Sequence, residues 1–115
     1  MKFQFHSSIL AHIETHLFIN GQTLTIIGVI MLINIGAEFG THLESSDIAT
    51  ELVDILNKIP EDNFIIDFKD VIFITMNFAQ SYYVAKLDSP KRISEINISD
   101  NIKVMMGAAD EACNP

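Results

Sequence analysis

The segment FIIDFKDVIFITMNFAQSYYVAKL, residues 64–87, decides the fold class that the sequence predicts. Its first five residues and residues 71–74 are short apolar runs of the kind that form buried strands. From Phe78 onward, apolar residues recur three and four positions apart, which is the spacing of an amphipathic helix. The sequence Asp88-Ser89-Pro90 ends this helix. Strands that alternate with helices are typical of α/β proteins with a mostly parallel sheet.

The same alternation extends to both sides of this segment. Two further strands are predicted at residues 31–35 and 92–98, and two further helices at residues 45–59 and from Ser99 or Asp100 onward. The first of these helices begins at the capping cluster Ser45 to Asp47 and ends at Pro60. Residues 37–44 predict a loop. We therefore expect an α/β domain with a mixed sheet of four to six strands and three helices.

Residues 1–30 are expected to add a β-hairpin extension to the edge of this sheet. Asn20-Gly21 stands between two apolar runs and predicts a hairpin with a type I′ turn. Residues 2–5 predict an additional edge strand, and residues 8–16 one or two amphipathic turns. Met31 is an alternative initiator, so the domain proper is expected at residues 31–112, followed by a frayed tail at residues 113–115.

Composition narrows the classes of partner. The chain has 115 residues and a formal net charge of −8, so it is expected to form one domain that repels nucleic acid and anionic membranes. The uncharged run at residues 24–35 is shorter than the ~20 residues that a membrane-spanning helix needs. Cys113 is the only cysteine, so no intrachain disulfide can form and a cytoplasmic location is expected.

Three segments together resemble the STAS-like family of unknown function: MLINIGAEFGTHLESSDIATELVDIL, FIIDFKDVIFITMNFAQSYYVAKL and RISEINISDNIKVMM. Two markers carry the resemblance, Glu38-Phe39-Gly40 and the set Asp67, Phe68, Val71, Ile74, Thr75, Phe78 and Ala79. The family is similar to the STAS domains of anti-sigma-factor antagonists. That resemblance implies helices packed on a mixed sheet, and docking onto ATP-binding kinases of the histidine-kinase superfamily.

In those regulators the kinase phosphorylates a serine where the loop after the strand enters the next helix. The resemblance therefore implies a partner-binding site at Thr75, Met76, Asn77, Phe78 and Gln80. Asn77 stands at the position of the serine and has no hydroxyl group, so it is expected to cap the helix rather than to accept phosphate. Thr75 is a second candidate phosphate acceptor, although a threonine at a strand end more often forms local hydrogen bonds. The expected function is a non-enzymatic interaction module.

Two alternative functions follow from other residues. A self-associating scaffold or small-ligand sensor would dimerise through the N-terminal hairpin and bind its ligand near the loop at residues 36–40.

A metal-dependent enzyme would use the histidines. His12 and His16 would share one face of a helix, and His6 and His42 could join them around zinc. No cysteine or carboxylate stands at a companion spacing, so we expect exposed histidines, no metal and no cofactor. Asp67 and Asp70 lie three residues apart on either side of a strand end, where acidic side chains are usually solvated, so neither is expected to serve in acid–base catalysis.

Overall fold

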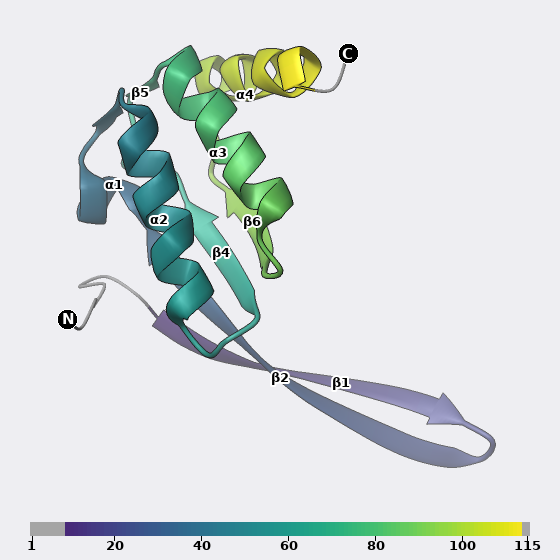
Figure 1. Ribbon diagram of the computed structural model, residues 1–115. Helices are drawn as coiled ribbons and strands as arrows, with labels where there is room; N and C mark the ends of the chain where they lie inside the picture. The colour runs from purple at the N-terminus through teal and green to yellow at the C-terminus, as the bar shows by residue number, and fades with distance from the viewer. Residues whose placement is uncertain (1–8, 114–115) are drawn as a thin grey trace.

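The main β-sheet has four strands in the order β1-β2-β4-β6 (Figure 1). This computed structural model describes residues 9–113, with the backbone alone at residues 9–15, 17, 19 and 24–27. The four strands are β1 (Ile9–Ile19), β2 (Gln22–Asn34), β4 (Asn63–Asp67) and β6 (Arg92–Ile96). β1 is antiparallel to β2, whereas β2, β4 and β6 are mutually parallel. The expected α/β class with a mostly parallel sheet is confirmed.

Four helices and a second, two-stranded sheet complete the described chain. The helices are α1 (Ile35–Phe39), α2 (Ser46–Lys58), α3 (Met76–Asp88) and α4 (Asp100–Cys113). The small sheet pairs β3 (His42–Leu43) in parallel with β5 (Phe73–Ile74). In Figure 1, α2 and α3 lie side by side on one face of the main sheet, and α4 packs against α3 near the carboxyl ends of the parallel strands. No helix among residues 9–113 is both long and apolar enough to cross a lipid bilayer.

The core lies between this face of the sheet and the helices. α2 begins at its cap Ser45, whose hydroxyl accepts from the Ile48 N–H, and buries Leu52 and Leu56 completely. Side chains at alternate positions of the strands, such as Ile66, point toward the helices and pack in the same core. An aromatic pair on α3, Phe78 and Tyr82, stacks with ring centroids 5.8 Å apart at the centre of this layer.

The predicted hairpin is confirmed, and most of it projects beyond the sheet. Asn20 and Gly21 have φ values of 52° and 76°, as a type I′ turn requires. β2 pairs with β4 only from Ile30 onward, so residues 12–19 and 22–29 pair with each other alone. We call this ribbon the arm (Figure 1). It contributes to a radius of gyration of 16.0 Å, compared with about 13 Å for a compact domain of this length.

Several sequence predictions near the N-terminus and the first crossover are wrong. The described part of residues 8–16 is extended strand rather than amphipathic turns, because it pairs with β2 along its length. Residues 37–44 are not a simple loop: the Asn34 side chain accepts from the Ala37 N–H and starts α1, and β3 follows. There are consequently four helices rather than three. The predicted boundary between residues 30 and 31 falls inside β2.

Two predictions near the C-terminus also change. The strand predicted at residues 92–98 ends at Ile96, because Asn97 adopts a positive φ of 56° and turns the chain. Cys113 is the last residue of α4 rather than the start of a frayed tail. The strand predicted at residues 2–5 and the tail residues 114 and 115 lie outside the described residues.

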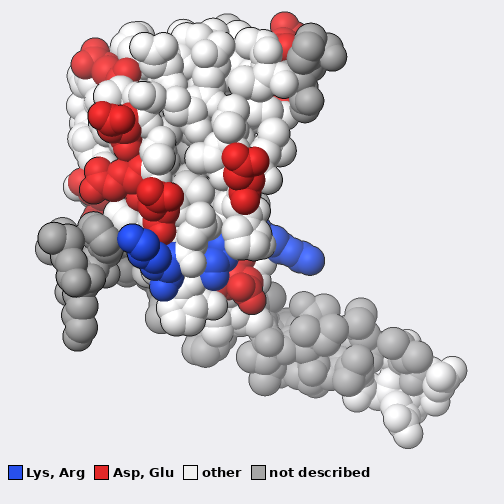
Figure 2. Space-filling model, viewed as in Figure 1, with Lys and Arg blue, Asp and Glu red and all other residues white. Residues whose placement is uncertain are grey.

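Acidic and basic side chains are unevenly distributed on the face that α2 and α3 cover: basic atoms appear only at its lower end, with acidic atoms among them (Figure 2). Asp47, Glu51 and Asp54 are exposed at helical spacing along α2, and acidic atoms follow this side of the face in Figure 2. Basic atoms gather at the lower end of the face, where α2 ends at Lys58. The end of the molecule at which α2 begins is therefore acidic.

Candidate functional site

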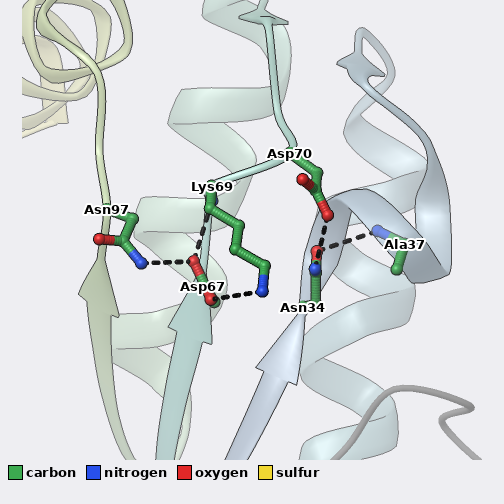
Figure 3. A network of polar contacts seen from close by, with 6 residues as sticks. All are labelled: Asn34, Ala37, Asp67, Lys69, Asp70 and Asn97. Atoms are coloured by element: carbon green, nitrogen blue, oxygen red, sulfur yellow. Dashed lines mark hydrogen bonds and ion pairs between the residues drawn. The ribbon is translucent and has the colours of Figure 1, made fainter.

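A network of polar side chains lies at the carboxyl ends of the three parallel strands (Figure 3). Asp67, at the end of β4, is only 5% exposed. Its Oδ1 accepts from the Lys69 backbone N–H at 2.9 Å and from Asn97 Nδ2 at 3.0 Å. The prediction that Asp67 is solvated is therefore wrong. Its burial is tolerated because two hydrogen bonds and the Lys69 ammonium, 4.0 Å away, compensate the lost hydration.

The second half of the network fixes the chain that leads from β4 to β5. Asn34 Nδ2 donates to Asp70 Oδ2 at 2.7 Å, while the Asn34 side-chain oxygen accepts from the Ala37 N–H at 3.0 Å. The backbone of Gly36 passes so close to Asp70 that an added Cβ would lie 2.8 Å from the Asp70 Cβ. Asp67 and Asp70 are thus bonded to different strand ends rather than to each other. This arrangement positions the following segment and does not form a carboxylate pair.

Thr75, rather than Asn77, caps α3. The Thr75 hydroxyl accepts from the Phe78 N–H at 3.2 Å and donates to the Glu44 carbonyl at 2.7 Å. Asn77 is the second residue of the helix and its side chain is exposed. The prediction that Asn77 is the cap is therefore wrong. A phosphate on Thr75 would remove the donor to Glu44, so the hydroxyl is committed to local structure.

The five residues predicted to bind a partner do not share one surface. Phe78 is completely buried, so its inclusion in a contact surface is wrong. Gln80 lines a groove of about 570 Å³ between α2 and α3, together with Thr50 and Asp54. Met76 is half-buried and packs against the core, whereas Asn77 next to it is exposed.

Two exposed apolar side chains in the segment that leads to Asn77 were missed by sequence reasoning. Ile72 is 61% exposed and Phe73 is 39% exposed, although they belong to an apolar run that predicted a buried strand. Only Val71 and Ile74 of this run face the core. Successive side chains of a strand point to opposite faces, so the sequence could have indicated that one of Phe73 and Ile74 faces outward.

Hydrogen bonds hold this apolar pair in place. The backbone N–H groups of Ile72 and Phe73 both donate to the Thr41 carbonyl, at 2.8 and 3.3 Å, and Asn101 Nδ2 donates to the Ile72 carbonyl at 3.2 Å. The ring of His42 lies with its centroid 6.3 Å from that of Phe73. We name the exposed Ile72, Phe73 and Asn77, together with the half-buried Met76, the β5–α3 surface.

The β5–α3 surface has acidic neighbours. Glu44 is exposed, and its carbonyl accepts the Thr75 hydroxyl, which places it beside the start of α3. Asp47 lies in the exposed first turn of α2, and Asp100 opens α4 next to Asn101. A partner that covers the apolar side chains would meet negative charge around them.

The two histidines that the metal-enzyme alternative would place on one helix face do not lie on a helix. His12 and His16 belong to strand β1, where four residues span about 13 Å instead of one helical turn. His42 lies on β3 and pairs with Phe73. Among the side chains that the structure describes, which do not include those of His12 and Glu14, no three histidine, cysteine or acidic groups are arranged to hold a metal ion. His6 lies outside the described residues.

A polar triad of Tyr82, Lys86 and Glu95 joins α3 to β6. The Tyr82 hydroxyl donates to Glu95 Oε2 at 2.6 Å, and Lys86 Nζ lies 2.9 Å from the same oxygen. Burial, reinforced by the negative charge and hydrogen bond of Glu95, raises the pKa of Tyr82 well above 10.0. Tyr82 is therefore a neutral hydrogen-bond donor that ties the core to the edge of the sheet.

Comparisons with protein-family models, with curated proteins and with solved structures found no match for this chain. The resemblance to STAS-like proteins therefore rests on the residues that carry it.

Proposed function

We propose that the protein is a non-enzymatic, STAS-like interaction module that docks a protein partner through the β5–α3 surface. The observation that supports this proposal best is the exposure of Ile72 (61%) and Phe73 (39%) in the segment that leads to the exposed Asn77. Apolar side chains of this size that are exposed together, and held by backbone hydrogen bonds, are typical of contact surfaces. A cytoplasmic location belongs to the same proposal.

The charges around the surface limit the chemistry of the partner. Glu44, Asp47 and Asp100 are exposed around the apolar side chains, so the partner should offer an apolar pocket with basic residues at its rim. We propose the ATP-binding domain of a histidine-kinase-type ATPase, the class of partner that the sequence resemblance implies. Because Asn77 has no hydroxyl group, phosphorylation at this position would not control docking.

Site-specific photo-crosslinking in the producing cells tests the proposal. A photoreactive amino acid at Asn77 should capture a protein that carries such an ATP-binding domain. The test variant is Ile72→Asp, which places a charge in the proposed contact. The matched control is Leu87→Asp, because Leu87 is 63% exposed and lies in the last turn of α3, away from Asn77.

We expect Ile72→Asp to reduce capture at least tenfold, while Leu87→Asp leaves it unchanged. Circular dichroism should show that both variants remain folded, since neither side chain is buried. Capture that survives Ile72→Asp would refute docking at this surface. Capture of a chain without an ATP-binding domain, lost in Ile72→Asp alone, would retain the surface and refute the kinase-type partner.

A further inference from the structure

No strand within residues 9–113 pairs with the outer edge of β1. β1 has 11 residues, about twice the usual length of a strand, and among the described residues it pairs only with β2. A long edge strand that presents unpaired backbone groups is a template for pairing with another chain.

The turn determines which backbone groups point outward. In a type I′ hairpin the residues that flank the turn, here Ile19 and Gln22, form a hydrogen-bonded pair. Hydrogen-bonded and non-hydrogen-bonded pairs then alternate, so Phe18 and Thr23 form a non-hydrogen-bonded pair. The backbone N–H and C=O groups of the even-numbered residues 12–18 consequently point away from β2, toward the open edge.

The distribution of charged residues along the chain favours contact between two copies at the edge of β1. Glu14 is the only charged residue in the sequence from 9 to 34. Residues 36–115 hold the other 14 acidic residues and six basic ones, which leaves −8 on the body of the molecule. Electrostatic repulsion between two copies is therefore strongest where their bodies approach and weakest where their arms approach. On the arm, Phe18 is 76% exposed.

We propose that the edge of β1 binds a second copy of this chain, forming a two-fold symmetric dimer with one continuous sheet of eight strands. The two β1 strands run antiparallel about an axis at Thr15, so that residue 14 pairs with residue 16 of the second copy, and residue 12 with residue 18. This register uses every outward-pointing backbone group of the arm from residue 12 to residue 18. The dimer does not depend on the proposed docking function.

Analytical ultracentrifugation of the full chain measures the dimer and its dissociation constant. Phe18→Pro removes the outward N–H of residue 18 and leaves the β1–β2 hydrogen bonds intact, because that N–H takes no part in them. Phe18→Ala is the matched control, since it removes the same ring and keeps the N–H. We expect dimers for the wild type and Phe18→Ala. The dissociation constant of Phe18→Pro should exceed that of Phe18→Ala by about thirtyfold, because symmetry removes two hydrogen bonds.

Cysteine crosslinking tests the register. In a Cys113→Ser background, Thr15→Cys places two sulfur atoms at the two-fold axis, where neighbouring Cα atoms of a non-hydrogen-bonded pair are close enough for a disulfide. Thr23→Cys lies on the far strand of the arm and should not crosslink. A wild type that stays monomeric at 100 µM or so, equal dissociation constants for the two Phe18 variants, or crosslinking at Thr23 but not at Thr15 would each overturn the proposal.

Discussion

Replacing Gly36 with alanine sets two physical effects against each other. Gly36 is a buried residue of α1, and alanine is favoured over glycine inside a helix by about 1 kcal/mol. Against this gain, the new Cβ would lie 2.8 Å from the Asp70 Cβ and 3.0 Å from its carbonyl carbon. Neither atom is the mobile end of a side chain, so α1 or the β4–β5 connection must move.

The steric cost should exceed the helical gain. Inserting a methyl group into a closely packed site typically costs about 1–3 kcal/mol. The move would also strain the 2.7 Å hydrogen bond between Asn34 and Asp70. We expect Gly36→Ala to lower the free energy of unfolding by about 1–2 kcal/mol, which lowers the melting temperature by about 4–8 °C in a domain of this size.

Gly107→Ala is the matched control, because Gly107 is also helical but has no atom within 4 Å of an added Cβ. It should raise the free energy of unfolding by about 0.5–1 kcal/mol. Urea denaturation followed by circular dichroism measures both changes, with equal m-values as evidence that the unfolding reaction is the same. If both alanine variants are stabilised, the close approach of Gly36 to Asp70 is refuted.

Three further predictions concern α3. Asn77→Asp should raise the free energy of unfolding by about 0.3–1 kcal/mol, since no acidic residue occupies the first turn of α3; a gain that 0.5 M salt does not reduce would contradict this reason. Thr75→Ala should lower it by about 1–2 kcal/mol, and Thr75→Ser should restore most of the loss; equal losses in urea denaturation would exclude the capping role. Above pH 10 the unfolded chain should lose the Tyr82 proton before the folded one, so wild-type stability falls with pH. Tyr82→Phe should remove up to about 1.4 kcal/mol per pH unit of this slope, and equal slopes would refute the raised pKa.

The sequence predicted the elements whose signals are local. The strand at residues 64–68 and the helix at residues 45–59 are found within two residues of their predicted ends, because cap, periodicity and terminator all lie within them. The hairpin followed from two residues alone, Asn20 and Gly21. α1 was missed because it has only five residues and its cap, Asn34, belongs to the preceding strand.

The site was less predictable because its contacts are distant in the sequence. The buried Asp67 accepts a hydrogen bond from Asn97, 30 residues later, and no local sequence pattern indicates that partner. Ile72 is exposed because its backbone bonds to Thr41, which turns an apolar run outward. The apolar spacing from Phe78 onward predicted the helix that follows Asn77, but the cap is Thr75, two residues before Asn77.

The two proposed surfaces lie at opposite ends of β2. The first eight residues of β2 belong to the arm. Asn34, the last residue of β2, forms a hydrogen bond with Asp70 in the connection that leads to β5 and α3 (Figure 1). Pairing of two arms would therefore leave both β5–α3 surfaces exposed, and the dimer could dock two partners at once. Such a dimer gains apparent affinity only for a partner that is itself dimeric. The two surfaces can be separated experimentally. Ile72→Asp should reduce capture of the partner and leave the dimer, measured by ultracentrifugation, unchanged. Phe18→Pro should weaken the dimer, while each monomer still docks its partner.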